Sequence, residues 1–207
     1  MALIELPDPE PDGSTSVERS IESRASHRSF AGTPVDLDDV SQLLWAAQGI
    51  THQRDGVAMR AAPSAGATYP LVAFLETAPN GVDGLEAGLY RYDPGDHSLE
   101  ATVGRTIRDA LTQAALGQAV VRGAAAIVVL TADYDRTLKQ YPDHGERYVH
   151  MEAGHAAQNV QLVSESRSLA SCPVGAFVDA DVAEALDLSK QHDPLYLIPF
   201  GNRLPTE

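Results

Sequence analysis

The sequence predicts an α+β sandwich in which helices surround one mixed sheet. Three observations support this: predicted strands and helices alternate irregularly, a hairpin pattern lies at 88–102, and one long helix begins near Arg147. At 207 residues the chain fits one domain that can bury a substantial core. We therefore expect a single domain at 15–207, preceded by a flexible arm at 1–14 that is rich in Pro, Asp, Glu and Gly.

The composition excludes several classes of protein. The net charge of −14 argues against a nucleic-acid partner, because phosphate binding requires a basic surface. The single cysteine, Cys172, excludes an internal disulfide and a cysteine metal cage, and we expect no metal. The sequence holds no apolar run near the ~20 residues of a membrane span, and its N-terminus lacks a signal pattern, so we expect a cytoplasmic protein.

The excess of acidic residues is unusual because it is combined with very few lysines. Asp and Glu number 29 against 15 Lys and Arg, and Lys139 and Lys190 are the only lysines. This pattern is typical of cytoplasmic proteins from salt-loving microbes, because high salt screens the self-repulsion of so much charge. An ordinary acidic protein is the alternative interpretation.

The N-terminal part predicts two helices. Ser16 can cap a helix at 17–24. Asp36 can cap a second helix, which ends at Gly49 and has an apolar face at positions 37, 40, 43, 44 and 47. The polar stretch at 51–60 predicts a mobile loop.

The middle of the chain predicts strands. Residues 62–70 are rich in turn-forming residues and precede a strand at 71–77. Strands at 88–92 and 98–102 flank Asp-Pro-Gly-Asp at 93–96, which predicts a β-hairpin. The other expected elements are a helix from about 105 to Gly117, a strand at 125–131, a polar loop or lid at 133–145, a short helix capped by Asp179 or Asp181, and a last strand at 195–200.

The stretch from Arg147 predicts one long helix with two apolar faces, and such a helix is usually buried. The first face carries Val149, Ala153, Ala156, Val160 and Val163, and the second carries Met151, His155, Leu162 and Leu169. Its small residues around Gly154 allow another backbone to approach, either in a monomer core or in a two-fold helix–helix contact. Pro173 and Gly175 then suit a turn that leaves backbone N–H groups free for a ligand, with a core strand as the alternative.

Several familiar catalytic motifs are absent from the sequence. His150 and His155 are five residues apart and point about 140° apart on a helix, whereas zinc needs an i, i+4 pair. Ser64 lacks the flanking glycines of a hydrolase nucleophile elbow. Neither a Walker loop nor a dinucleotide glycine fingerprint is present.

One cluster of cations remains. Arg24, Ser26 and Arg28 stand at alternate positions of a predicted loop, and Arg203 lies near the far terminus. Guanidinium groups match phosphate oxygens, so this set predicts a phosphate clamp. Solvated surface arginines are the alternative.

The stretch RASHRSF at 24–30 resembles the N-terminal R-x-S-x-[RK]-x-F signature of the nitroreductase family of FMN-dependent oxidoreductases. Further stretches that resemble this family, in the same order and spacing, lie at 41–51, 60–70, 88–94, 115–118 and 147–177. Together they resemble the SagB-type branch, which includes the thiazoline and oxazoline dehydrogenases of peptide-modifying clusters. The resemblance covers nearly everything after residue 20.

The resemblance implies a nitroreductase-like sandwich, whose central sheet is mostly antiparallel and flanked by helices, and a homodimer with FMN at the interface. The cofactor-binding residues that it implies are Arg24, Ala25, Ser26, Arg28, Pro63, Ser64, Ala65, Gly66, Val174, Gly175, Ala176 and Arg203. By resemblance, Arg24, Ser26 and Arg203 hold the phosphate and ribityl chain. Arg28 lies near flavin N1 and O2, where a positive charge raises the flavin potential.

The resemblance also implies that residues 63–66 reach the flavin from the other subunit, and that Gly175 and Ala176 offer a backbone N–H to flavin N5. The family often has Asn where this chain has Ala67, so one flavin contact is absent or replaced.

The implied activity is hydride transfer from NADH or NADPH through FMN to an electron-poor organic acceptor. Azoline dehydrogenases use an adjacent Lys-Tyr pair, where this chain has Gln140 and Tyr141, with Lys139 one place earlier. We expect Tyr141 and Lys139 as the catalytic side chains of a free-standing flavin reductase. An azoline dehydrogenase and a non-catalytic flavin-binding subunit of a peptide-modifying complex are the alternatives.

Overall fold

A computed structural model describes residues 3–205 of the chain. Its centre is a seven-stranded sheet with the order β1-β6-β5-β4-β7-β9-β8, in which all neighbouring strands run antiparallel. The strands are β1 (Leu3–Glu5), β4 (Leu71–Thr77), β5 (Gly88–Asp93), β6 (Ser98–Val103), β7 (Ala126–Asp133), β8 (Leu169–Ser171) and β9 (His192–Asn202). The predicted α+β class is confirmed.

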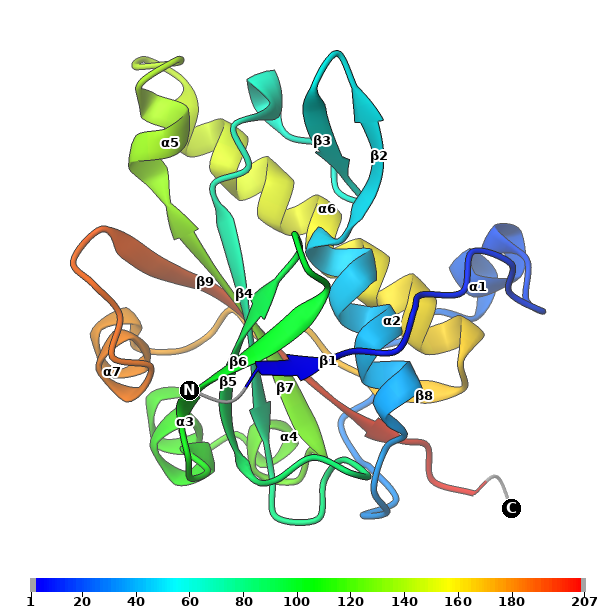
Figure 1. Cartoon of the computed structure of the whole chain (residues 1–207). Helices are drawn as coiled ribbons and strands as arrows, with labels where there is room; N and C mark the ends of the chain where they lie inside the picture. The colour runs from blue at the N-terminus through cyan, green and yellow to red at the C-terminus, as the bar shows by residue number, and fades with distance from the viewer. Residues whose placement is uncertain (1–2, 206–207) are drawn as a thin grey trace.

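Helices cover both faces of this sheet (Figure 1). The first face packs against α2 (Leu37–Gln48) and the long α6 (Gly145–Ser166), and α1 (Val17–Ser23) contacts α6. The opposite face packs against α3 (Arg108–Ala114), α4 (Ala119–Arg122) and α7 (Asp179–Ala185). At one end of the sheet, α5 (Tyr134–Leu138) follows β7 directly.

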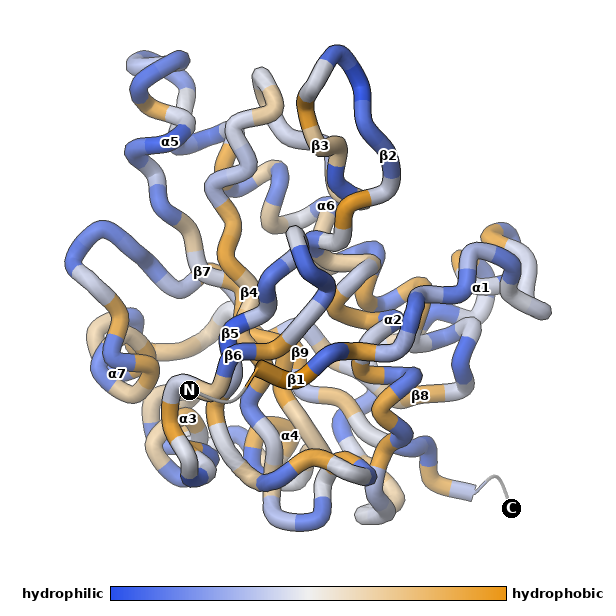
Figure 2. The backbone as a smooth tube through the Cα atoms, viewed as in Figure 1, coloured by the Kyte–Doolittle hydropathy of each residue, from blue (hydrophilic) through white to orange (hydrophobic). Residues whose placement is uncertain are grey.

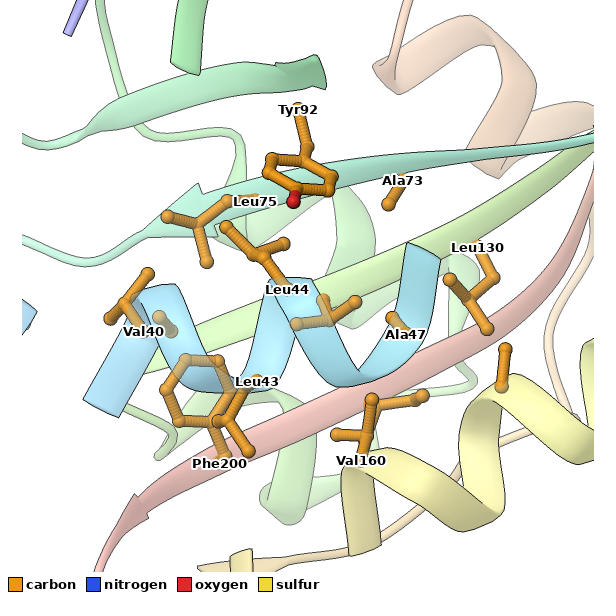
Figure 3. Packing of buried hydrophobic residues seen from close by; sticks show 14 of the residues in the cluster. Val40, Leu43, Leu44, Ala47, Ala73, Leu75, Tyr92, Leu130, Val160 and Phe200 are labelled. Atoms are coloured by element: carbon orange, nitrogen blue, oxygen red, sulfur yellow. The ribbon is translucent and has the colours of Figure 1, made fainter. Parts of the chain in front are cut away.

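The larger core lies between the sheet and the α2–α6 layer. Leu43 and Leu44 of α2 are fully buried, and Figure 3 shows the α2 side chains between the strands and Val160 of α6. Truncating a leucine at such a site typically costs 2–5 kcal/mol of stability. Figure 2 shows the same separation along the chain: hydrophobic residues gather on the central strands, and hydrophilic residues gather on α5 and on the tip of a small hairpin.

That hairpin contradicts the mobile loop expected at 51–60. The segment forms a separate two-stranded sheet of β2 (Ile50–Arg54) and β3 (Val57–Arg60). Asp55 and Gly56 both have positive φ, of 52° and 79°. An Asp-Gly pair in this conformation is the two-residue turn that best suits a hairpin, and the polar composition hid that signal.

The predicted helix ends were accurate in the N-terminal part and less so later. Ser16 caps α1, accepting a hydrogen bond from the Arg19 N–H at 3.2 Å, and Gly49 ends α2. Asp36 holds the N-cap position of α2 without making a side-chain hydrogen bond.

Three later expectations need correction. The helix expected from about 105 begins at Arg108 and gives way to α4. The segment at 133–145 is not only a loop, because α5 occupies its first half. Val178, not Asp179 or Asp181, is the N-cap residue of α7. At α7 a tertiary contact absent from the local pattern is present, since the Val178 N–H donates to the Ala114 carbonyl at 2.9 Å. The start of α5, in contrast, is capped locally: the Asp133 side chain accepts from the Asp135 N–H at 3.1 Å.

The N-terminal segment, expected to be a flexible arm, lies along the domain. Ile4 pairs with Leu99 in the β1–β6 ladder, and Leu6 is buried. The Pro7 carbonyl accepts a 2.5 Å hydrogen bond from the Ser41 hydroxyl of α2. These strand and side-chain contacts offset the entropy lost on ordering the segment.

Candidate functional site

The predicted cation loop, residues 24–28, connects α1 to the edge of the sheet. Arg24 is the C-cap of α1, and its Nη1 donates to Gln161 Oε1 of α6 at 3.3 Å. The His27 N–H donates to the Ser171 carbonyl of β8 at 3.0 Å. Ser26 and Arg28 are exposed, and Arg28 Nη1 donates to the Ser26 carbonyl at 3.4 Å. The loop is thus held from both sides, with its hydroxyl and second arginine on the surface.

Glu165 joins the two ends of the chain at this loop. Its carboxylate is 2% exposed and accepts from Arg203 Nη2 at 2.5 Å and from the Ala25 N–H at 3.3 Å. Arg203 Nε also donates to the Leu169 carbonyl at 3.0 Å. Burial alone would raise the pKa of Glu165, but the hydrogen bonds from Arg203 and Ala25 hold that pKa below its ordinary value.

The turn after β8 lies beside the cation loop. Val174 and Leu197 exchange two backbone hydrogen bonds, of 2.7 and 3.0 Å, and Gln118 Nε2 donates to the Ala176 carbonyl at 2.9 Å. Gly175 and Ala176 are exposed, and neither N–H has an acceptor within residues 3–205. The turn therefore presents two free backbone donors, as its Pro and Gly predicted.

The 63–66 loop, unlike the turn after β8, is held by a hydrogen bond to a residue close to it in the sequence. Ser64 Oγ accepts from the Tyr69 N–H at 2.9 Å, and the loop continues into a short 3-10 turn, η1 (Ala65–Ala67). Gly66 has φ of 59°, and a Cβ there would lie 2.5 Å from the side-chain oxygen of Gln140. The positive φ favours glycine at this position, and the flexible end of the Gln140 side chain lies over it.

The structure does not bring this loop to the cation loop within one chain. Ser64 faces Glu152 on α6, whereas Arg24 contacts Gln161, which is nine residues further along. Nine residues correspond to a rise of about 14 Å along a helix. In Figure 1 α5 lies near one end of α6 and α1 near the other.

The two expected catalytic residues lie at the same end as the 63–66 loop. Lys139 is the exposed C-cap of α5. Tyr141 is half-buried, with its ring edge-on to Tyr148 at 5.2 Å between ring centroids. Lys139 and Tyr141 therefore lie near the loop of Pro63, Ser64, Ala65 and Gly66, and not near Arg24 and Arg203.

Between the two ends, α6 has an exposed face. The second apolar face was expected to be buried, but Met151 is 52% exposed, His155 is exposed and Leu162 is half-buried. The fourth residue of that face, Leu169, is buried but lies in β8, because α6 ends at Ser166. Gly154 is exposed as well. The sheet and α2 cover only the face of Val149 and Val160. A Cβ at Gly154 would meet no atom within 4 Å.

The sequence analysis did not identify the α6 residues that contact the cation loop near one end of the helix and the 63–66 loop near the other. Gln161 and Glu165 are four residues apart and so share one helix face, and this spacing was the signal in the sequence that could have identified them.

Glu152 is 2% exposed, and its Oε1 has no hydrogen-bond partner within residues 3–205. Burial raises the pKa of Glu152 to about 7, against smaller lowering effects of the Ser64 hydroxyl and Arg60. A carboxyl in this state can hold or release a proton near neutral pH.

No helix in the described part of the chain is long and apolar enough to cross a membrane.

Comparison with known proteins places the chain in a family. The model of the nitroreductase family matches residues 21–202. The nitroreductase homologue MJ1384 of Methanocaldococcus jannaschii is 38% identical over 201 residues, which cover 97% of this chain and 96% of that protein. The microcin B17-processing protein McbC of Escherichia coli is 26% identical over 151 residues, 71% of this chain and 56% of McbC. A nitroreductase-type crystal structure from Ralstonia eutropha JMP134 superposes with a TM-score of 0.83 at 26% identity, covering 99% of this chain and 90% of that one.

Proposed function

The chain belongs to the nitroreductase family of oxidoreductases, and from that premise we propose that it is an FMN-dependent enzyme. In this proposal it takes hydride from NADH or NADPH and passes it to an electron-poor organic acceptor. The observation that carries the proposal is the convergence of Arg203 and the Ala25 N–H on Glu165, with Arg24 bonded to Gln161 one turn away on α6, beside the free N–H groups of Gly175 and Ala176.

The residues present fit FMN. Family members typically bind this cofactor, and when bound it supplies two-electron chemistry at its N5 atom. Arg24 and the exposed Ser26 offer a cation and a hydroxyl to a phosphate, with Ala25 between them. Arg203 is held by Glu165 and Leu169, so the guanidinium beside them is already oriented.

The other groups would act on the ring system. The free Gly175 and Ala176 N–H groups suit an acceptor nitrogen, and Val174 fixes their turn against Leu197. Arg28 adds an exposed positive charge next to Ser26. In the proposal this charge stabilises the reduced, anionic form of the cofactor.

We further propose that a second copy of the chain completes the site. Nitroreductases are typically dimeric, and one chain alone keeps residues 63–66 about 14 Å along α6 from the cation loop. Pairing two copies through the exposed face around Gly154 would bring the 63–66 loop of one copy to the cation loop of the other. Tyr141 and Lys139 would then lie over the site and tune the choice of acceptor.

The similarity to McbC supports the alternative functions, an azoline dehydrogenase or a flavin-binding subunit without turnover. The position of the expected lysine is Gln140, whose amide packs on Gly66. Lys139, one position earlier, is exposed, as is Gln140. This arrangement favours the free-standing reductase.

The test begins with the purified protein, which we expect to be yellow and to contain FMN. Anaerobic NADPH should bleach the flavin absorbance, and an electron-poor acceptor should restore it. A bound flavin that neither NADH nor NADPH bleaches would favour the non-catalytic subunit. A colourless protein that does not take up added FMN would overturn the proposal.

A further inference from the structure

A cavity of about 600 Å³ is lined by none of the residues assigned to FMN, and its lining residue Tyr69 donates a hydrogen bond to Ser64 of the neighbouring 63–66 loop. It forms because β4 and β5 pair only over residues 74–77 of β4, and beyond that point the two strands separate (Figure 1). The β2–β3 hairpin borders the opening. Its polar lining includes Arg60, Arg91, Arg136, Gln48, Tyr69 and Tyr92.

Arg60 is a partly buried cation without an acidic partner. Its Nη1 donates to Gln48 Oε1 at 2.7 Å and to the Leu71 carbonyl at 3.4 Å, and its guanidinium lies 4.9 Å from the centre of the Tyr69 ring. No carboxylate of residues 3–205 lies within ion-pair distance, and no described residue accepts from its Nε or Nη2. A desolvated charge in this state is unfavourable unless a counter-ion arrives.

Arg136 adds a second cation at the same place. Its Nη1 donates to the Tyr69 carbonyl at 3.0 Å, and its Nε lies 3.4 Å from Asp133. Burial lowers the pKa of Arg60 most, and repulsion from Arg136 lowers it further, while Glu152 partly compensates. Tyr69 therefore holds two guanidinium groups, one over its ring and one on its carbonyl.

At the end of the cavity away from Arg60, acidic residues lie near Arg91, so the net charge is closer to zero. Arg91 is opposite Glu100 in the β5–β6 ladder, and the Glu100 carboxylate lines this end of the cavity too. Asp93 also lines this end, and its Oδ1 accepts from the Gly95 N–H at 2.7 Å. Within residues 3–205, Arg60 is thus a half-buried cation of the cavity without an ion-pair partner, and Arg136, already paired with Asp133, adds a second positive charge beside it, in a chain whose net charge is −14.

We propose that this cavity is a binding site for a small organic oxyanion, a carboxylate or a phosphate ester, held by Arg60 and Arg136. The free donors of Arg60 suit two oxygens of one anionic group. Apolar lining from Ile50, Val57 and Val72 receives the rest of the molecule. Because the Arg60 N–H donates to the Tyr69 hydroxyl at 3.1 Å, an occupant would also stiffen the base of the 63–66 loop.

The proposal is tested on the FMN-loaded protein, so that the phosphate clamp is already filled. Calorimetric titrations use inorganic phosphate in one arm and succinate in the other, and NMR follows the Arg60 Nε–Hε signal. We expect at least one probe to bind and to shift that signal. Arg60→Gln and Arg136→Gln should each weaken binding about tenfold or more, as expected for loss of a charged hydrogen bond. Arg54→Gln, at a 73% exposed side chain of β2 outside the cavity, is the matched control.

The outcomes separate the possible ligands. Binding of phosphate alone identifies a phosphate ester, binding of succinate alone identifies a carboxylate, and binding of both supports the shared oxyanion chemistry. If neither probe binds, or if binding survives Arg136→Gln in a folded protein, the site is not an anion site. Phosphate binding that is lost with Arg24→Ala but not with Arg136→Gln belongs to the cation loop and equally overturns the proposal. Arg136→Gln should disturb folding less than Arg60→Gln, because the Arg136 side chain is 42% exposed.

Discussion

Arg203 Nη2 donates a 2.5 Å hydrogen bond to Oε2 of Glu165, and this pair joins the residue that follows β9 to α6. The same carboxylate accepts from the Ala25 N–H. One buried acid therefore positions both a distant arginine and the loop that carries Arg24. The first two predictions follow from this arrangement.

Glu165→Gln should destabilise the protein at pH 7 by about 1–3 kcal/mol, less than for a fully buried pair because Arg203 is partly exposed. The folded state holds the pKa of Glu165 below 4.5, so the wild-type carboxylate stabilises the fold above that pH, and this contribution disappears as the pH falls through the lowered value. Urea unfolding at pH 7 and pH 4 measures the difference between the two proteins. The difference in unfolding free energy should be smaller at pH 4 than at pH 7. An equal difference at both pH values would contradict the lowered pKa of Glu165.

Arg24→Ala should weaken FMN binding by about 1.5–3 kcal/mol, the range for a hydrogen bond to a charged group. Flavin fluorescence quenching on titration of the apoprotein gives the Kd. Arg19→Ala is the control, because Arg19 lies on the exposed face of α1 and pairs only with Glu22 in the described structure. Equal affinities of the two variants would remove Arg24 from the phosphate site.

Gly154→Leu should abolish the dimer without unfolding the monomer, since a Cβ at Gly154 meets nothing within the chain. Gly104→Leu is the matched control, at another glycine whose Cβ would meet no atom. Light scattering should show a wild-type dimer that is stronger in molar salt, because salt screens the acidic surface. A wild-type protein that is monomeric with FMN bound, in both molar salt and dilute buffer, would refute the proposed pairing.

Glu152→Gln should stabilise the protein at alkaline pH. Burial raises the pKa of Glu152 from 4.5 to about 7, so its favourable contribution is complete below pH 4.5 and is lost as the pH rises through 7. Glutamine keeps the neutral state at every pH. The gain over wild type should grow between pH 5 and pH 8 to about 2–3 kcal/mol at most. Thermal unfolding across this range provides the measurement, and a flat difference would mean that Glu152 stays ionised.

The double substitution Lys139→Ala with Tyr141→Phe should slow reoxidation of the flavin by the acceptor and leave its reduction by NADPH unchanged. The reason is that the cofactor receives the hydride itself, whereas a positioned acid typically contributes ~10²–10⁴-fold to proton transfer. Stopped-flow absorbance resolves the two half-reactions. No change in either one leaves these residues without a chemical role, and a slower reductive half-reaction would place the nicotinamide at the lid.

Local chemistry was enough to predict many elements of this protein. Ser16 and Gly49 mark helix ends because capping is a property of neighbouring residues. The strand β4 (Leu71–Thr77) was predicted with its observed bounds because an apolar run at 71–75 follows a segment rich in turn-forming residues. The cation loop was recognisable because its residue types and spacing are themselves the motif.

Other features depend on residues that meet only after folding. The partners of Arg203 are Glu165 and Leu169, more than thirty residues away, and no local pattern links them. The cavity beside Arg60 lies where β4 and β5 are no longer paired, and that pairing joins segments that are distant in the sequence. The sequence by itself determined the fold class, the family resemblance and the candidate residues, since these depend on residue type and spacing. Only the tertiary structure decided which of them lie together, because burial and charge pairing are set by contacts between distant segments.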